Sequence, residues 1–258
     1  MIDKRELLSK ARERKLNLNI IEKDYVLGWL LFGFSKIDSL VFKGGTALSK
    51  IYFPEIWRLS EDLDFSLIKD DFSDVFERAQ DLLALVAKES GIPFNIKSRH
   101  SNPHYLQLKI QYNGPIGRNF VKVDFMKNDL VDQPVNKSMS KSYSDYKNFK
   151  VKVESINEIF CSKLRTVIER KKCRDFFDLW QLTKLRLNLK RIREILPEKL
   201  KIKGLKFSSK SQIFPRDIKE TIGPFWEKEL GRLVDPLPEM DMVLKELSNF
   251  IERELTFQ

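Results

Sequence analysis

The sequence predicts an α/β (α+β) protein, in which a domain with a mixed sheet over residues 1–135 precedes a helical C-terminal domain over residues 150–258. The strand patterns lie before about residue 130, interleaved with helical ones, whereas the chain beyond about residue 150 carries apolar residues mainly at helical spacing. Residues 136–149 between them are polar and rich in Ser, Lys and Asn, so we expect a linker or mobile loop there.

The first domain is expected to open with two helices. Residues 3–15 are charged with spaced leucines, and Asn19 can cap a second helix whose apolar residues recur at helical spacing as far as Phe34. A short apolar strand then ends at a double glycine, and a helical segment follows it. The remaining predictions are, in order, a strand over 59–68, a helix over 74–89 and strands over 94–99, 105–112 and 120–126.

The second domain is expected to contain helices only. Apolar residues at helical spacing predict them over residues 155–170, 174–184, 189–196 and 239–255.

Composition excludes several classes of protein. The chain has 258 residues, of which 42% are hydrophobic and 33% charged, so it is neither disordered nor a membrane protein. Its charged start is unlike a signal peptide, and two cysteines (Cys161 and Cys173) cannot form a disulfide framework, so we expect a cytoplasmic protein. The net charge of +10 favours an anionic partner, with nucleic acid the first candidate.

One candidate site surrounds the double glycine at residues 44–45. Glycines let the backbone approach a phosphate closely, and the N–H groups of the helix start can face it. Thr46 can add a hydroxyl contact and Lys50 a positive charge, so Gly44, Gly45, Thr46 and Lys50 are candidate nucleotide-binding residues. The alternative is an ordinary tight turn in which Thr46 caps the helix.

A second candidate site lies on the strand that follows. Alternate residues of a strand share a face, which would place Arg58, Ser60, Asp62 and Asp64 on one side. Two neighbouring carboxylates repel each other unless a cation lies between them, and Mg²⁺ prefers carboxylate oxygens. The pattern therefore indicates a metal site, with a solvated edge strand neutralised by Arg58 as the alternative.

Asp124 is the candidate third carboxylate. It alternates with buried residues in the segment Val-Lys-Val-Asp-Phe, so it would join Asp62 and Asp64 if their strands pair. Three carboxylates can hold two metal ions in phosphoryl or nucleotidyl transfer. Alternatively, Asp124 is an exposed residue paired with Lys122 or Lys109.

The helical half contributes a Lys-Leu-Arg segment and an Arg-Asp-x-x-Asp segment. Asp175 would lie in the first turn of a helix and Asp178 one turn later, and Lys163 could reach a triphosphate or pair with Asp178. Helix capping plus a buried ion pair explains the same residues without a function.

Five motifs in this order resemble a known family. Gly-Gly-Thr, Arg-x-Ser-x-Asp-x-Asp-Phe, Lys-Val-Asp, Lys-Leu-Arg and Arg-Asp-x-x-Asp between Phe42 and Trp180 are similar to the AbiEii/AbiGii-type nucleotidyltransferases. These are toxins of type IV toxin–antitoxin and phage abortive-infection systems, and their relatives include the mycobacterial MenT toxins.

The resemblance implies a polymerase-β-like nucleotidyltransferase domain and a set of site residues. By it, Gly45 and Thr46 would contact the triphosphate, Asp62 and Asp64 would bind Mg²⁺ or Mn²⁺, and Asp124 would be the third carboxylate. Lys163 and Asp178 would match residues needed for activity, and Ser60 a position that is phosphorylated in some relatives.

We therefore expect transfer of a nucleotide from an NTP to an RNA 3′ end, with the tRNA acceptor stem favoured and a cognate antitoxin as partner. One alternative is nucleotidyl or phosphoryl transfer to a protein hydroxyl, such as that of Ser60 or of an antitoxin. A second alternative is a non-enzymatic, basic RNA-binding module whose aspartates are structural.

Overall fold

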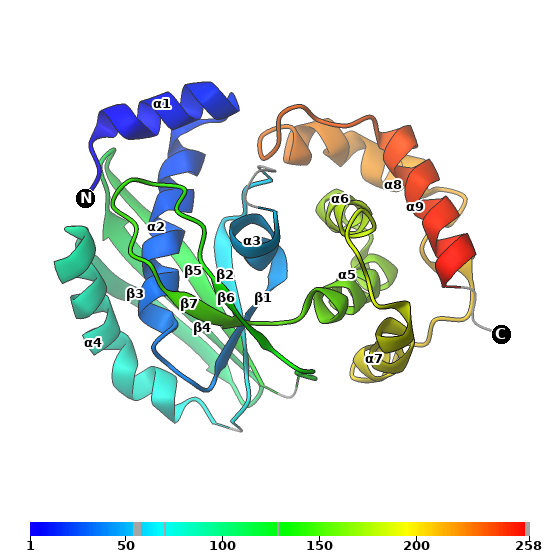
Figure 1. The fold of residues 1–258 in the computed structure, drawn as a ribbon, viewed down its shortest axis with the longest axis horizontal. Coiled ribbons are helices and arrows are strands. Elements are labelled where there is room, and N and C mark those ends of the chain that lie inside the picture. Colours follow the sequence, from blue (N-terminus) through cyan, green and yellow to red (C-terminus); the bar gives the residue numbers. More distant parts are fainter. Residues whose placement is uncertain (54–57, 70, 128, 256–258) are drawn as a thin grey trace. The chain divides into compact units, whose positions relative to one another are not determined.

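The computed structural model describes the chain except residues 54–57, 70, 128 and 256–258. It divides into two compact units, Met1–Glu154 and Ser155–Gln258, which run from blue to green and from green to red in Figure 1. No helix among the described residues is long and apolar enough to cross a membrane.

The described part of the first unit is built on a seven-stranded mixed sheet in the order β3-β4-β5-β2-β1-β7-β6. β2 pairs with β5 and β1 with β7 in parallel, and the other neighbours are antiparallel. The strands are β1 (Leu40–Lys43), β2 (Asp62–Leu67), β3 (Phe94–Asn102), β4 (Tyr105–Asn113), β5 (Arg118–Met126), β6 (Val135–Ser138) and β7 (Lys150–Val153). The helices are α1 (Lys4–Arg14), α2 (Leu18–Phe34), α3 (Gly44–Ala47), the π-helical turn η1 (Leu48–Tyr52) and α4 (Ser73–Ser90).

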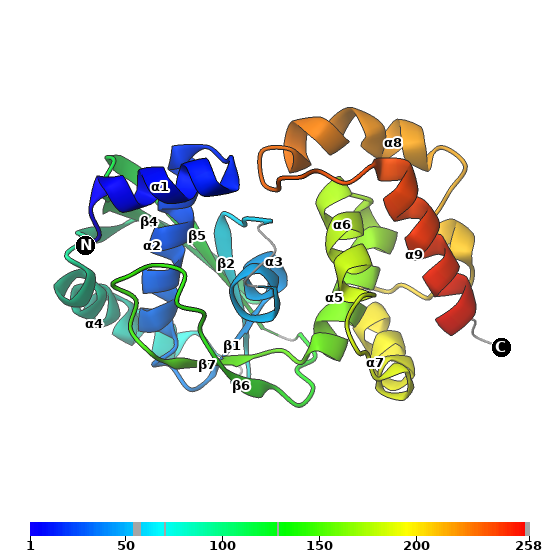
Figure 2. The ribbon, with the colours of Figure 1, turned by 45° about the horizontal axis from the view of Figure 1, so that its top comes forward.

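One face of the sheet is apolar because β2, β4 and β5 alternate buried and less buried side chains. α2 packs on this face, where Phe34 lies 5.4 Å from Phe125 between ring centroids, and Phe125 stacks on Phe65 at 5.6 Å. α4 contacts α2 and β3 (Figures 1 and 2). The alternate residues of β2 and β5, which include Asp62, Asp64, Lys122 and Asp124, therefore project from the opposite face.

The segment expected as a linker or mobile loop, residues 136–149, instead belongs to the first unit. β6 pairs with β7, so residues 150–153, predicted within the helical domain, are part of the sheet as well. Tyr143 and Tyr146 are buried against α2, where the Tyr146 hydroxyl donates to the carbonyl oxygen of Tyr25 at 2.7 Å. The prediction was wrong because the two tyrosine rings supply apolar surface within an otherwise polar stretch.

The described residues of the second unit are helical, as predicted. Its elements are α5 (Ile156–Arg170), α6 (Cys173–Leu182), α7 (Leu189–Lys201), the 3-10 turn η2 (Lys210–Gln212), α8 (Ile218–Phe225), the π-helical turn η3 (Trp226–Leu230) and α9 (Met240–Glu254). α7 runs past the predicted end at residue 196, and its Lys199 forms a fully buried ion pair with Glu158 of α5. The mixed sheet followed by helices confirms the predicted α/β class.

Candidate active site

Three aspartates project from the polar face where β2 and β5 run side by side. Asp64 is the register partner of Asp124, and Asp62 is the partner of Lys122. Residues in register on neighbouring strands share a face, and Phe65 and Phe125, one position further, stack on the other. The sequence placed Asp124 with Asp62 and Asp64 only if the strands that carry them pair, and β2 and β5 do pair.

Burial, and after it the neighbouring charges, alter the pKa of Asp62. Burial raises the pKa of Asp62, the charge of Asp124 raises it further, and Lys122 opposes both effects. A half-buried carboxyl group with a raised pKa and a second carboxylate nearby has a deficit of positive charge around it. A cation bound here would relieve that deficit.

Two residues of β4 hold Asp124, and the sequence analysis missed both. The Tyr105 hydroxyl and the Gln107 side-chain amide each donate to Asp124 Oδ1 at 2.8 Å. Burial and the hydrogen bond to Asp124 raise the pKa of Tyr105, so its hydroxyl stays protonated and donates. The alternation of polar residues along β4 was the signal that could have revealed them. Asp124 is thus held by these neutral partners, although it was also considered as a partner of Lys109 or Lys122.

The residues fit a divalent cation by chemistry, but the side chains do not form a finished chelate. Among the described residues, no group of three or more His, Cys, Asp or Glu side chains is placed so that it could hold a metal ion. The hydrogen bonds of Asp124 to Tyr105 and Gln107 hold its Oδ1 at β4. The carboxylate oxygens that Mg²⁺ prefers are nevertheless concentrated on this one face.

The glycine turn lies against one of these carboxylates, that of Asp64. Gly44 has a φ of +79°, and a Cβ at this position would lie 2.5 Å from Asp64 Oδ2. A Cβ on Gly45 would lie 2.5 Å from Arg58 Nη2 and 3.3 Å from Ser60 Oγ. Gly44 is therefore required by its backbone conformation and by its close approach to Asp64, whereas a side chain at Gly45 would displace the end of the Arg58 side chain.

Thr46 connects the glycine turn to the strand that carries Asp62 and Asp64. It is fully buried, and its hydroxyl donates to the carbonyl oxygen of Asp62. The hydroxyl therefore anchors α3 to the start of β2, which differs from both the phosphate contact and the helix cap considered for it.

Arg58 and Ser60 do not lie on the strand as predicted, because β2 begins only at Asp62. The described residues before Asp62 have no register partner on β5. Arg58 is buried, and its guanidinium donates to the carbonyl oxygen of Leu59 at 3.0 Å. Both side chains reach Gly45 from this segment, so they remain next to the glycine turn.

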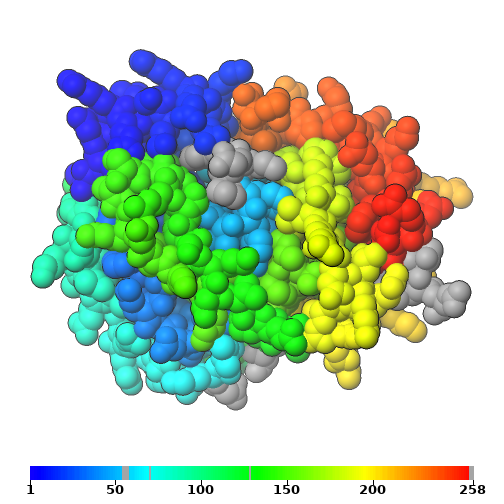
Figure 3. Space-filling view, viewed as in Figure 1, coloured from blue at the N-terminus to red at the C-terminus, as the bar shows by residue number. Residues whose placement is uncertain are grey.

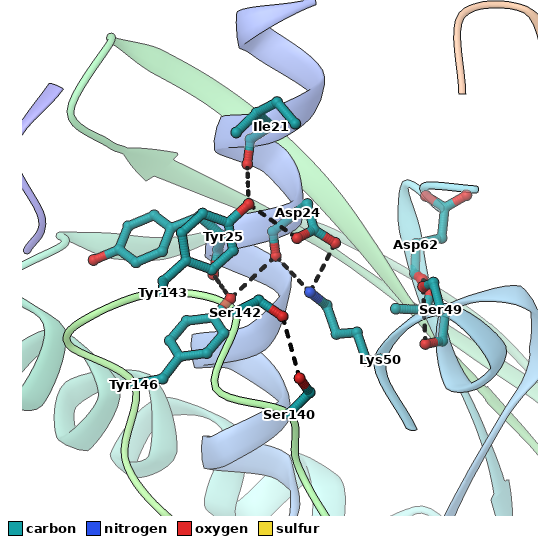
Figure 4. A network of polar contacts seen from close by, with 11 residues as sticks. Ile21, Asp24, Tyr25, Ser49, Lys50, Asp62, Ser140, Ser142, Tyr143 and Tyr146 are labelled. Carbon is teal, nitrogen blue, oxygen red and sulfur yellow. Dashed lines mark hydrogen bonds and ion pairs between the residues drawn. The ribbon is translucent and has the colours of Figure 1, made fainter. Parts of the chain in front are cut away.

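Lys50 has a different environment from the one expected of a nucleotide ligand. Its side chain is buried, and its ammonium group donates to Oδ1 (2.8 Å) and to the carbonyl oxygen (2.9 Å) of Asp24 on α2. Tyr143 donates to the other carboxylate oxygen of Asp24 at 3.0 Å. Figure 4 shows this network, in which Lys50 ties η1 to α2. We therefore leave Lys50 out of the proposed nucleotide site.

Lys163 and Asp178 lie in the second unit and contact each other there. The Lys163 ammonium is 2.6 Å from Asp178 and 3.1 Å from Asp175, and Arg170 donates to both carboxylate oxygens of Asp175. Burial raises the pKa of Asp175, but the charge of Lys163 and the hydrogen bonds from Arg170 outweigh it and hold this pKa well below its usual range. The buried ion pair considered from the sequence is therefore present.

Comparison with known proteins identifies the family. Residues 29–252 match the family model of the AbiEii nucleotidyl transferase toxin of type IV toxin–antitoxin systems. The chain belongs to the AbiEii nucleotidyltransferase toxins. This membership confirms the resemblance and the predicted enzymatic class, a nucleotidyltransferase. No curated protein matches the sequence.

Solved structures support the same fold. MenT4, a nucleotidyltransferase toxin from Mycobacterium tuberculosis H37Rv, is 18% identical, with a TM-score of 0.76 over 100% of this chain and 91% of that one. JHP933 from Helicobacter pylori is 20% identical, with a TM-score of 0.60 over 93% of this chain and 94% of that one. At these identities, the comparison shows similarity of fold.

Proposed function

We propose that this AbiEii toxin is a metal-dependent nucleotidyltransferase that transfers a nucleotide from an NTP to the 3′ end of an RNA, with the tRNA acceptor stem as the favoured acceptor. The observation that carries the proposal is the shared face of Asp62, Asp64 and Asp124, which the glycine turn contacts at Asp64. Nucleotidyl transfer depends on positioning and on neutralising phosphate charge, and carboxylates next to a glycine turn supply the groups for both.

The residues divide the work as follows. Asp62 and Asp64 would hold Mg²⁺ or Mn²⁺, which supplies Lewis-acid activation and charge neutralisation when bound. The backbone at Gly44 and Gly45 would accommodate the triphosphate, with Arg58 and Ser60 beside it. Asp124, oriented by Tyr105 and Gln107, would accept the proton of the acceptor hydroxyl as its oxygen attacks the α-phosphate and pyrophosphate leaves. We assign no step to Lys163 and Asp178, although the family resemblance makes both candidates for activity.

The acceptor and partners follow from charge and family. A net charge of +10 favours a polyanionic acceptor such as RNA. As a type IV toxin, the protein is proposed to have a cognate antitoxin, and its use of NTPs places the reaction in the cytoplasm.

The test is transfer of label from each α-labelled NTP to total RNA, with and without Mg²⁺. We expect Asp62→Asn and Asp64→Asn to abolish labelling while leaving the urea unfolding midpoint within the range of a matched control, Asp81→Asn, on the exposed side of α4. Unchanged labelling in both site variants would refute the proposal. Label on the protein, detected by intact mass and absent from Ser60→Ala, would favour the protein-hydroxyl alternative.

A further inference from the structure

A polar surface extends from the aspartates across β5, β4 and β3. In register order, Asp62 lies beside Lys122, Lys122 beside Lys109, and Lys109 beside Ser98. The neighbouring row runs from Asp124 through Gln107 to His100. We call Ser98, His100, Lys109, Arg118, Phe120 and Lys122 the strand platform; none of these residues is buried.

The charges of the strand platform are arranged at a cost to stability. Lys109 and Lys122 are direct register partners on antiparallel strands, and like charges in this position repel. Asp124 is the one acidic side chain that the described residues of β3, β4 and β5 place on this face. Positive charge gathered beside the carboxylates, with two lysines in direct register, points to an anionic ligand.

Phe120 adds an aromatic surface to this charge. The residue is 42% exposed on the part of β5 that precedes the first register pair with β2, and the Lys109 ammonium is 3.8 Å from the ring centroid. In proteins that bind single-stranded nucleic acid, bases stack on exposed aromatic rings and the phosphates bind nearby positive side chains.

We propose that the strand platform binds the single-stranded 3′ end of the acceptor RNA, with a base stacked on Phe120 and phosphates at Lys109 and Lys122. Lys122 is one strand spacing, roughly 4.8 Å, from Asp62, and Phe120 is four residues, roughly 13 Å, along β5 from Asp124. A chain stacked at Phe120 would thus pass the lysines before its terminal hydroxyl reaches the aspartates. The inference rests on the proposed function, because it assigns a surface to that reaction's acceptor.

The NTP is the less favoured occupant of this surface. The proposed triphosphate site lies at the glycine turn, beside Asp64 and Arg58. Phe120 and Lys109, by contrast, extend away from it along β5 and onto β4.

The test measures binding without catalysis, by fluorescence anisotropy of a labelled, unstructured RNA of about a dozen nucleotides in the absence of NTP. Phe120→Ala should raise the Kd roughly tenfold, since stacking of one base is worth about that factor or more. Lys109→Gln should lower the slope of log Kd against log salt by about 0.7, the contribution of one phosphate contact in a single strand.

The matched controls are on α4. Phe76 is 39% exposed and forms a cation–π contact with Arg99, so Phe76→Ala removes a similar pair from another surface, and Lys88→Gln removes an exposed charge. Neither should change the Kd. Strand-platform variants that bind like these controls would overturn the inference, even where the wild-type enzyme labels RNA. A raised KM for NTP with an unchanged Kd for RNA would overturn it as well, by assigning the surface to the nucleotide. Failure of the proposed function would be recognised separately, because the Asp62→Asn and Asp64→Asn variants would then label RNA as well as the wild type does.

Discussion

The buried pair between Lys50 and Asp24 should control the stability of the first unit, and Lys50→Met tests this. The change removes the ammonium group from Asp24 Oδ1 and from the Asp24 carbonyl oxygen, and leaves Tyr143 as a donor to Oδ2. The lost charge-assisted hydrogen bond is worth about 1.5–3 kcal/mol, whereas the Asp24 carbonyl oxygen stays within α2 with the Tyr146 hydroxyl at 3.3 Å. The buried Asp24 carboxylate also loses its cation, so we expect a total loss of about 3 kcal/mol, at the lower end of the range of about 3–5 kcal/mol for breaking a buried ion pair.

The assay is urea unfolding, with hydrogen exchange of the α2 amides as a local measure of the first unit. Lys219→Met is the control, because Lys219 and Asp241 form an ion pair with both side chains more than half exposed, which contributes at most about 1 kcal/mol. A loss of unfolding free energy in Lys50→Met no larger than in this control would refute the assignment of Lys50 to a structural role. Lys50 would then return to the candidate nucleotide ligands.

Three further predictions concern the aspartates and the glycine turn. Because burial and Asp124 raise the pKa of Asp62, Mn²⁺ binding followed by electron paramagnetic resonance should weaken as pH falls through that raised pKa, and Asp124→Asn should move the loss to lower pH. Gly44→Ala should reduce the transfer rate about 100-fold or more by displacing the carboxylate it touches; Gly204→Ala, which has a positive φ but open space around it, should leave the rate unchanged. Asp175→Asn should cost roughly 3 kcal/mol of unfolding free energy at neutral pH. Since the pKa of Asp175 is depressed, the stability that its carboxylate contributes is present above about pH 4 and is progressively lost below it. The difference in Tm between Asp175→Asn and wild type should therefore become smaller below about pH 4.

The parts of the fold that follow from local pattern were predictable, and those set by long-range pairing were less so. The alternation in β4 and β5 and the periodicity of α4 and α5 predicted those elements because one face of each is buried. Residues 136–149 show the opposite case. Their polar composition predicted a loop, and nothing in it indicated that β6 would pair with β7 or that Tyr143 would bond to Asp24.

The candidate site shows the same division. Asp62, Asp64 and Asp124 could be selected from the sequence because alternation assigns each to a polar face, but the pairing of β2 with β5 had to be assumed. The partner of Lys50 could not be predicted, since its position after the glycine turn indicates only that it lies on the next helical turn. Whether its ammonium meets a phosphate or Asp24 depends on α2, which is distant in the sequence.

The apolar side of the sheet explains why the aspartates meet at all. Phe65 and Phe125 are register partners whose rings stack at 5.6 Å with an interplanar angle of 14°. If β2 moved by one residue along β5, each of the two rings would lie opposite a residue whose side chain is on the polar face, because side chains alternate with a period of two. Burial of the aromatic pair against Phe34 of α2 therefore selects the register in which Asp64 lies beside Asp124. The mutual repulsion of the carboxylates opposes that register, so the hydrophobic core holds together an arrangement of charge that the polar face alone would not maintain.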